Sequence, residues 1–230
     1  MIPLKSEEPR RNFPIVTVLL IALNFFVFFY QLSLRPKTEN ALIASLGVVP
    51  ARAERMLAHP AGRVGPAIIP LVTSMFLHGG WLHILGNMLF LWVFGGNVED
   101  RLGHSRYVAF YFVCGIGSAI VHILANWGSA VPTIGASGAI SGVMGAYIVL
   151  LPRSRILTLV PLLIFFFRFR IPAVLMIGYW FVIQFLSGVS SLGEADRGGV
   201  AWWAHVGGFL LGAFLVWGIR ESRPRPSYSY

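Results

Sequence analysis

Long apolar runs separated by short polar segments dominate the hydropathy pattern of this 230-residue chain. A membrane-spanning helix needs about 20 apolar residues. The runs free of Asp, Glu, Lys and Arg are residues 12–34, 64–98, 107–152, 171–193 and 198–219. The run 107–152 is long enough for two helices, and "NWGSAVPTIG" supplies the turn between them. The pattern therefore predicts six spans, at 14–33, 82–98, 106–126, 137–151, 171–189 and 201–219.

The same pattern predicts one membrane domain with short polar ends. Residues 1–13 are expected to be a cytoplasmic amino-terminal segment, residues 14–219 the six-helix domain, and residues 220–230 a cytoplasmic tail. No small-residue cleavage site follows the first span, and its apolar length exceeds the usual core of a signal peptide. We therefore expect that span to be retained.

Composition and charge support the membrane class and set the topology. Charged residues make up 12% of the chain, against about 25% in soluble proteins. An amino terminus in the cytoplasm places twelve of the eighteen Lys and Arg inside, as the positive-inside rule favours. The net charge of +9 is thus explained by the membrane topology. It favours anionic membrane lipid over nucleic acid as a partner. The residues placed inside are Lys5, Arg10, Arg11, Arg101, Arg106, Arg153, Arg155, Arg168, Arg170, Arg220, Arg223 and Arg225.

The polar inventory excludes several kinds of membrane chemistry. None of the nine acidic residues lies inside a predicted span, which argues against a paired-aspartate protease and against carboxylate proton relays. No HExxH occurs, so a zinc protease has no support and no metal or cofactor is expected. The only lysines are Lys5 and Lys37, so no lysine base is available in the membrane. The single Cys114 cannot form a disulfide within the chain.

Histidine, serine and asparagine remain as candidates. The predicted topology starts spans two, four and six at the outer face. Span two begins "WLHILGN", with His83 and Asn87 four residues apart on one helical face. Span four begins at Ser137 in "GASG", and span six begins "AWWAHVGG" with His205. Four polar residues from three helices are therefore predicted at one depth, whereas His122 is expected to be a helix-packing hydrogen bonder.

Small residues at regular spacing predict a close approach of spans four and six. Taken alone, these glycines indicate only a packing seam, which does not explain the histidine at matching depth. Two soluble motifs also fail for "GASGAISG": no lysine follows as in a phosphate loop, and Ala139 stands where a nucleophile elbow needs glycine. The small residues are Gly138 and Gly142, Ser141 and Gly145, and Ala204, Gly208 and Gly212.

The stretches "GASG", "AHVGGFLLG", "HILGN" and "VEDRLG" resemble, in order and spacing over about residues 68–215, the rhomboid family of intramembrane serine proteases. The resemblance implies an all-α, six-helix membrane bundle. It implies Ser137 as nucleophile and His205 as general base, with His83, Asn87 and the Ser137 backbone N–H stabilising the oxyanion. It further implies transmembrane protein substrates with helix-destabilising segments near the outer face. We expect a bacterial inner membrane with both termini cytoplasmic.

Other positions of the motifs are interpreted as structural, and two features depart from the family pattern. Some members carry an aromatic residue four positions after the nucleophile, where it packs on the histidine. Ser141 stands there, so the sequence leaves open how His205 is held. The Trp-Arg pair of some first loops is also missing. The structural positions are Gly135, Gly138, Glu99, Arg101, Gly103, Gly208 and Gly212.

Two further segments are predicted to lie at the membrane surface. The first loop, residues 35–81, contains an apolar stretch broken by glycine and proline, which we expect half-embedded at the outer interface. Residues 156–167, "ILTLVPLLIFFF", are too short to span and are bounded by arginines. They are predicted to form a cytoplasmic interfacial or re-entrant segment.

Two other functions are alternatives to an intramembrane protease. A catalytically inactive rhomboid-like protein that binds and escorts membrane proteins would have lost the serine or the histidine, and this chain keeps both. A small-solute transporter with broken helices would be built from two related halves, and the sequence shows none.

Overall fold

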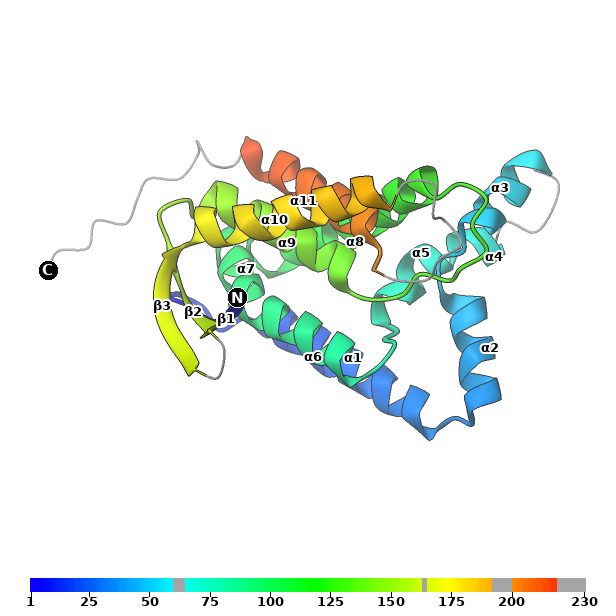
Figure 1. Ribbon diagram of the computed structural model, residues 1–230, viewed down its shortest axis with the longest axis horizontal. Helices are drawn as coiled ribbons and strands as arrows, with labels where there is room; N and C mark the ends of the chain where they lie inside the picture. Colours follow the sequence, from blue (N-terminus) through cyan, green and yellow to red (C-terminus); the bar gives the residue numbers. More distant parts are fainter. Residues whose placement is uncertain (60–64, 163–164, 192–199, 219–230) are drawn as a thin grey trace, which may run out of the picture.

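The protein forms a helical membrane bundle with a small sheet at one end (Figure 1). The computed structural model describes residues 1–59, 65–162, 165–191 and 200–218. The long helices are α1 (Ile15–Ser33), α6 (Trp81–Phe90) continued by the π-helical turn η2 (Leu91–Gly95) and α7 (Gly96–Leu102), α8 (His104–Ala125), α9 (Ser137–Leu150), α10 (Ala173–Ser190) and α11 (Trp202–Trp217). Each predicted span is helical, with bounds that differ by a few residues.

Four of these helical segments are long and apolar enough to cross a membrane: α1, Trp81–Leu102, α8 and α10. The helices α9 and α11 are shorter apolar helices. With 14 residues, α9 is roughly 21 Å long at 1.5 Å per residue, whereas the hydrocarbon core is about 30 Å thick. A helix of this length cannot reach from one interface to the other, so one end of α9 lies below a membrane surface.

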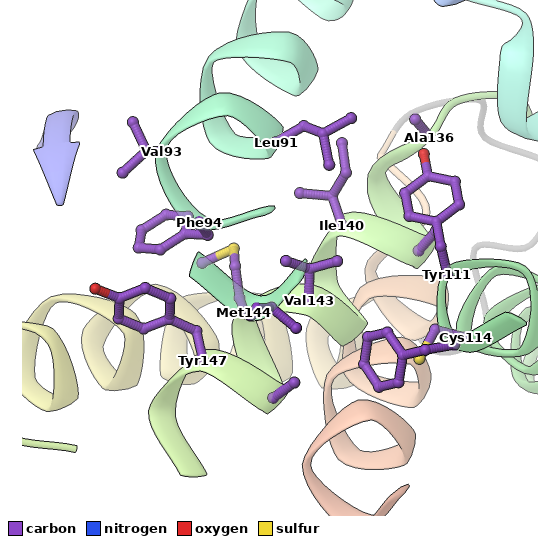
Figure 2. Close-up of a cluster of buried hydrophobic side chains, with 14 of the residues drawn as sticks. Leu91, Val93, Phe94, Tyr111, Cys114, Ala136, Ile140, Val143, Met144 and Tyr147 are labelled. Carbon is purple, nitrogen blue, oxygen red and sulfur yellow. The ribbon is translucent and has the colours of Figure 1, made fainter. Parts of the chain in front are cut away.

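The core of the bundle surrounds α9. Figure 2 shows Ile140, Val143 and Met144 of α9 directed at side chains of η2 and α8. Almost the whole of α9 is buried, and it contacts α8, α10 and α11 as well as the segment from α6 to α7. This central position explains why α9 shows no amphipathic stripe: a helix covered on all sides is apolar all round.

Close backbone contact between α9 and α11 holds the centre together. A Cβ atom at Gly208 would overlap the Gly138 carbonyl oxygen, and one at Gly212 would overlap the Gly142 carbonyl oxygen. On the other side, a Cβ at Gly145 would overlap the carbonyl oxygen of Phe209. The small residues identified in the sequence therefore lie in one seam, where only glycine allows this approach.

The motif "VEDRLG" ties the start of α1 to the end of α7. The buried carboxylate of Glu99 accepts hydrogen bonds from Val16 N–H (2.9 Å), Thr17 N–H (2.8 Å) and the Thr17 hydroxyl (2.6 Å). A carboxylate at this place satisfies amide groups that the first turn of a helix leaves free. Arg101 forms an ion pair with Glu8 at 2.8 Å, and Gly103 adopts φ +81° at the turn into α8.

The first loop is built of short helices and is attached to the loop before α9. These helices are α2 (Pro36–Leu46), α3 (Pro50–Ala58), α4 (Gly65–Ile68), α5 (Pro70–Thr73) and the 3-10 turn η1 (Ser74–Phe76). Val48 and Thr133 exchange both backbone hydrogen bonds, at 2.9 and 2.8 Å. The Thr73 hydroxyl donates to the Leu46 carbonyl at 2.8 Å. This loop is thus anchored through its backbone.

A three-stranded antiparallel sheet, which the sequence analysis did not predict, closes one end of the bundle (Figure 1). It consists of β1 (Ile2–Ser6), β2 (Arg155–Leu162) and β3 (Phe165–Pro172), in the order β1-β2-β3. Residues 156–167, which were expected to form an interfacial or re-entrant segment, lie in β2 and β3 as far as they are described. The Ser6 and Tyr147 hydroxyls, 2.6 Å apart, join the sheet to α9. The predicted tail 220–230 lies outside the described residues.

The glycine seam gives a direct test of the packing. Gly212→Ala should lower the free energy of unfolding by about 1–3 kcal/mol, the usual cost of inserting atoms into a packed core, because the new Cβ meets backbone rather than a movable side chain. Gly178→Ala is the matched control: nothing lies within 4 Å of its Cβ position, so better helix propensity should leave stability equal or higher. Thermal unfolding in detergent would measure both, and equal stability of the two variants would contradict the seam.

Candidate active site

Ser137 and His205 meet across the α9–α11 seam. Ser137 is the first residue of α9, and His205 lies in the first turn of α11. The Ser137 Oγ and His205 Nε2 atoms are 2.8 Å apart, and the histidine is buried. The predicted meeting of these two residues from separate helices is therefore present in the fold.

Gln184 of α10 holds the other side of the imidazole. His205 Nδ1 lies 2.7 Å from the Gln184 side-chain oxygen, and both residues are buried. An amide oxygen only accepts hydrogen bonds, so His205 Nδ1 carries the ring proton and donates it to Gln184. Nε2 is then free of a proton and can accept the Ser137 hydroxyl hydrogen, which is the tautomer that a general base requires.

Aromatic rings of α10 and α11 flank His205. The Trp180 ring lies 5.9 Å from the imidazole, centroid to centroid, and that of Trp202 lies 6.4 Å away at nearly a right angle. Trp180 and Gln184 are four residues apart, hence on one face of α10. Ser141 instead donates its hydroxyl to the Ser137 carbonyl at 2.6 Å. The question left open by Ser141 thus has an answer: α10, not α9, orients the histidine.

His83 and Asn87 of α6 present donors to the same cavity as Ser137. The Gly79 backbone N–H donates to His83 Nδ1 at 3.3 Å, so Nε2 carries the proton and is a donor. Asn87 Nδ2 is buried and makes no hydrogen bond to any residue that the structure describes. A buried amide without a hydrogen bond costs free energy of folding. At the wall of a cavity it can donate that hydrogen bond to a ligand.

Two glycines at the start of α9, Gly135 just before it and Gly138 in its first turn, allow close approach to neighbouring side chains. Gly135 has φ +126°, a conformation that favours glycine, and its N–H donates to the Ser74 carbonyl at 2.9 Å. A Cβ at Gly135 would lie 2.7 Å from His83 Nε2. At Gly138 a Cβ would overlap the Ser118 hydroxyl. Both positions therefore need glycine for space, and Gly135 also for its backbone angle.

The cavity has a volume of about 590 Å³ and is bordered by α6, α9, α10, α11 and the loop before α9. Its wall is mainly apolar and includes Phe90, Ile140 and Met144. At its polar end lies the start of α9, whose first amide groups have no intrahelical acceptor and carry the positive end of the helix dipole. The site thus places a serine hydroxyl, an imidazole and several hydrogen-bond donors at one end of an apolar cavity.

The remaining histidines near the site have other surroundings. His122 Nε2 lies 2.8 Å from the Thr133 hydroxyl and its Nδ1 lies 3.2 Å from the Asn126 amide nitrogen, so it ties α8 to the following loop. His78, in the turn before α6, stacks edge-on against His83 with 5.0 Å between ring centroids. Burial and the neighbouring His83 lower the pKa of His78 to about 3, so it adds no charge beside His83. Within the described ranges, no cluster of His, Cys, Asp and Glu could hold a metal ion.

Gln184 and Trp180 are the site residues that the sequence analysis missed. A usable signal was present: Gln184 is the only side-chain amide in the apolar run 171–193, which contains no Asp, Glu, Lys, Arg or His. A strongly polar group in a membrane helix usually faces the bundle interior and has a partner there. Nothing in the sequence, however, identifies that partner as His205.

The apolar helices show that this is a multi-pass integral membrane protein. The serine and histidine paired inside the bundle are of the kind found in hydrolases. Comparison with known families gives the class its name. The family model of the Rhomboid domain matches residues 66–222, more than half of the chain, and the chain belongs to the rhomboid family.

Individual relatives come from several eukaryotes. The chain is 32% identical over 161 residues to "Rhomboid protein 1, mitochondrial" of Saccharomyces cerevisiae, covering 67% of this chain and 42% of that protein. It is 29% identical over 207 residues to RHOMBOID-like protein 5 of Arabidopsis thaliana, covering 87% and 58%. It is 31% identical over 123 residues to the human "Presenilin-associated rhomboid-like protein, mitochondrial", covering 51% and 32%. The chain thus spans from about a third to somewhat over half of these relatives.

Proposed function

We propose that the protein is an intramembrane serine protease that cuts peptide bonds in or near transmembrane segments with a Ser137–His205 dyad. Rhomboid proteins include serine proteases and relatives without activity, so family membership alone does not decide. The observation that carries the proposal is the hydrogen-bonded series Ser137–His205–Gln184, at 2.8 and 2.7 Å. It sets the tautomer in which imidazole accepts the serine proton, which an inactive binding protein would not need.

In the proposed reaction, Ser137 Oγ attacks the carbonyl carbon of the scissile bond while its proton passes to His205 Nε2. The carbonyl oxygen becomes an oxyanion, which accepts hydrogen bonds from His83 Nε2–H, Asn87 Nδ2–H and the Ser137 backbone N–H. When the C–N bond breaks, His205 gives its proton to the leaving amine. Water, deprotonated by the same imidazole, then releases the acyl group from Ser137.

The proposed substrates are transmembrane proteins whose helix is easily unwound near the outer face. Ser137 lies at the start of α9, in the wall of a mainly apolar cavity. A peptide carbonyl inside a helix is occupied by its own hydrogen bond, so a segment with low helix propensity is easier to extend into the cavity. Membrane lipid is the proposed surrounding partner.

For its location, we propose a bacterial inner membrane with both termini in the cytoplasm. Support for the orientation comes from the twelve Lys and Arg that it places inside. The names of the yeast and human relatives contain "mitochondrial" and lend the bacterial setting no support. Reporter fusions at each loop would test the orientation, and an external amino terminus would overturn it.

Ser137→Ala and His205→Ala should each abolish cleavage of a transmembrane substrate, and the double variant should be no worse than either single one, because the pair acts as a unit. A labelled fluorophosphonate should react with the wild type in lipid and not with Ser137→Ala. Ser33→Ala, at the end of α1, is the control that should keep labelling. Absence of Ser137-dependent labelling and cleavage in every lipid would favour the inactive escort protein instead.

Asn87→Ala should lower kcat roughly tens- to a thousandfold with little change in KM, because oxyanion donors act mainly in the transition state. Stability should fall by less than about 2 kcal/mol, the upper range for an interhelical hydrogen bond in membranes. Asn24→Ala is the control: Asn24 is buried in α1 and donates to its own helix at Leu20, so it should affect stability alone. Full activity per folded molecule of Asn87→Ala would end the oxyanion assignment.

Gln184→Leu should lower kcat about ten- to a hundredfold while KM stays within about twofold, at the lower end of what general base catalysis contributes, because Leu offers His205 Nδ1 no acceptor. Gln184→Glu keeps an acceptor of the same length and should retain most of the rate. Val182→Ala, on an exposed part of α10, controls for general effects on the helix. If Leu and Glu at position 184 behave alike, Gln184 does not act through the histidine.

A further inference from the structure

The outer strand of the sheet carries a row of exposed phenyl rings that the active site does not explain. Phe165, Phe167 and Phe169 are 62, 44 and 47% exposed. Neighbouring centroids are 6.4 and 6.3 Å apart, so the three rings form a ladder along one face of β3. A contiguous row of exposed aromatic side chains marks an interaction surface.

The register of the sheet shows which way this ladder faces. Directly paired residues of antiparallel strands share a face, and Phe169 pairs with Thr158 while Ile171 pairs with Ile156. Ile156 and Thr158 are completely buried, and Ile156 belongs to the core of the helical bundle. The ladder therefore lies on the side of the sheet that faces the bundle, and its exposure shows that the helices do not cover it there.

The opposite side of the hairpin carries basic side chains among apolar ones. Side chains alternate along a strand, so Arg168 and Arg170 point away from the bundle. Lys5 pairs with Leu157, which pairs with Arg170, and so joins the same face. Arg170 is 70% exposed and lies 2.9 Å from Glu7. The hairpin is therefore a ribbon with the phenyl ladder toward the bundle and with guanidinium groups, beside the exposed Phe166, away from it.

The position of the ribbon matches a membrane surface. Its strands lie across the end of the bundle (Figure 1), and β3 continues directly into α10, whose first residues include the exposed Val174 and Leu175. The phenyl ladder is thus continuous with a lipid-facing helix surface. Side chains reach about 5 Å to either side of a sheet, since stacked sheets lie about 10 Å apart. That reach is at the lower end of the depth, about 5–10 Å, to which interfacial elements bury their apolar face.

We propose that the β2–β3 hairpin binds anionic phospholipid: the phenyl ladder enters the acyl-chain boundary of the leaflet at the sheet end of the bundle, and Arg168 and Arg170 bind lipid phosphate groups. Aromatic rings and snorkelling arginines are the side chains suited to this level of a bilayer. The charge of the ribbon selects an anionic lipid over a zwitterionic one.

Site-directed spin labelling of the full chain in phosphatidylcholine–phosphatidylglycerol nanodiscs tests the depth. A label at Phe167→Cys should be reached by oxygen and protected from a water-soluble nickel reagent, whereas a label at the adjacent Arg168→Cys should show the reverse. The unmodified chain, with only the buried Cys114, reports background. Equal aqueous access at both positions would overturn the proposal, and so would spin–spin broadening that places a second copy's strand against β3.

Lipid selectivity is tested by native mass spectrometry of protein extracted from those nanodiscs. Arg168→Gln and Arg170→Gln should each reduce the retention of phosphatidylglycerol about fivefold relative to phosphatidylcholine. Arg35→Gln, which replaces an arginine before α2 in the first loop, is the matched control that should leave retention unchanged. Unchanged retention in the hairpin variants would overturn the proposal. Because neither readout uses catalysis, failure here is separate from failure of the proposed protease function.

Discussion

Between α9 and α11 the chain packs backbone against backbone, because Gly138 and Gly142 meet Gly208 and Gly212 with no side chain between them. Lipid tails are as apolar as leucine, so helices in a membrane associate through close contact and hydrogen bonds rather than through the hydrophobic effect. The seam supplies that contact and also sets the distance from Ser137 to His205, since both residues lie within one turn of it. Packing and chemistry therefore depend on the same few glycines.

Polar side chains can lie inside a membrane protein at low energetic cost when they form hydrogen bonds with one another. A hydroxyl, an imidazole and an amide would each be expensive alone in a low-dielectric environment. In the series from Ser137 through His205 to Gln184 the hydroxyl and the imidazole each donate to the next group, and such connected bonds strengthen each other. The amide nitrogen of Asn87 makes no such bond within the described residues, and it lies where the proposed reaction develops negative charge.

Much of this arrangement was predictable from the sequence. Charge-free length predicted the helices, and the alternating direction of the spans predicted that Ser137, His205 and His83 would share a depth. Gln184 was not placed, because hydropathy locates a polar residue along a helix but does not identify its partner on another helix. The hairpin was missed for a different reason. The alternation Phe167-Arg168-Phe169-Arg170-Ile171 indicates a strand. It follows directly on an uninterrupted apolar stretch, however, and the composition of that stretch indicates lipid contact and not a sheet.

The three helices that hold Ser137, His205 and Gln184 are joined in two different ways. The contact of α9 with α11 runs through main-chain atoms, whereas α10 reaches His205 through the side chains of Gln184 and Trp180. Bilayers of different thickness change the tilt of helices that face lipid, and most of α10 does. A thinner or thicker bilayer would therefore leave the serine and histidine together and act on the orientation of the imidazole ring. For the proposed protease, the host membrane's lipid composition would then tune turnover through α10 while Ser137 and His205 stay paired.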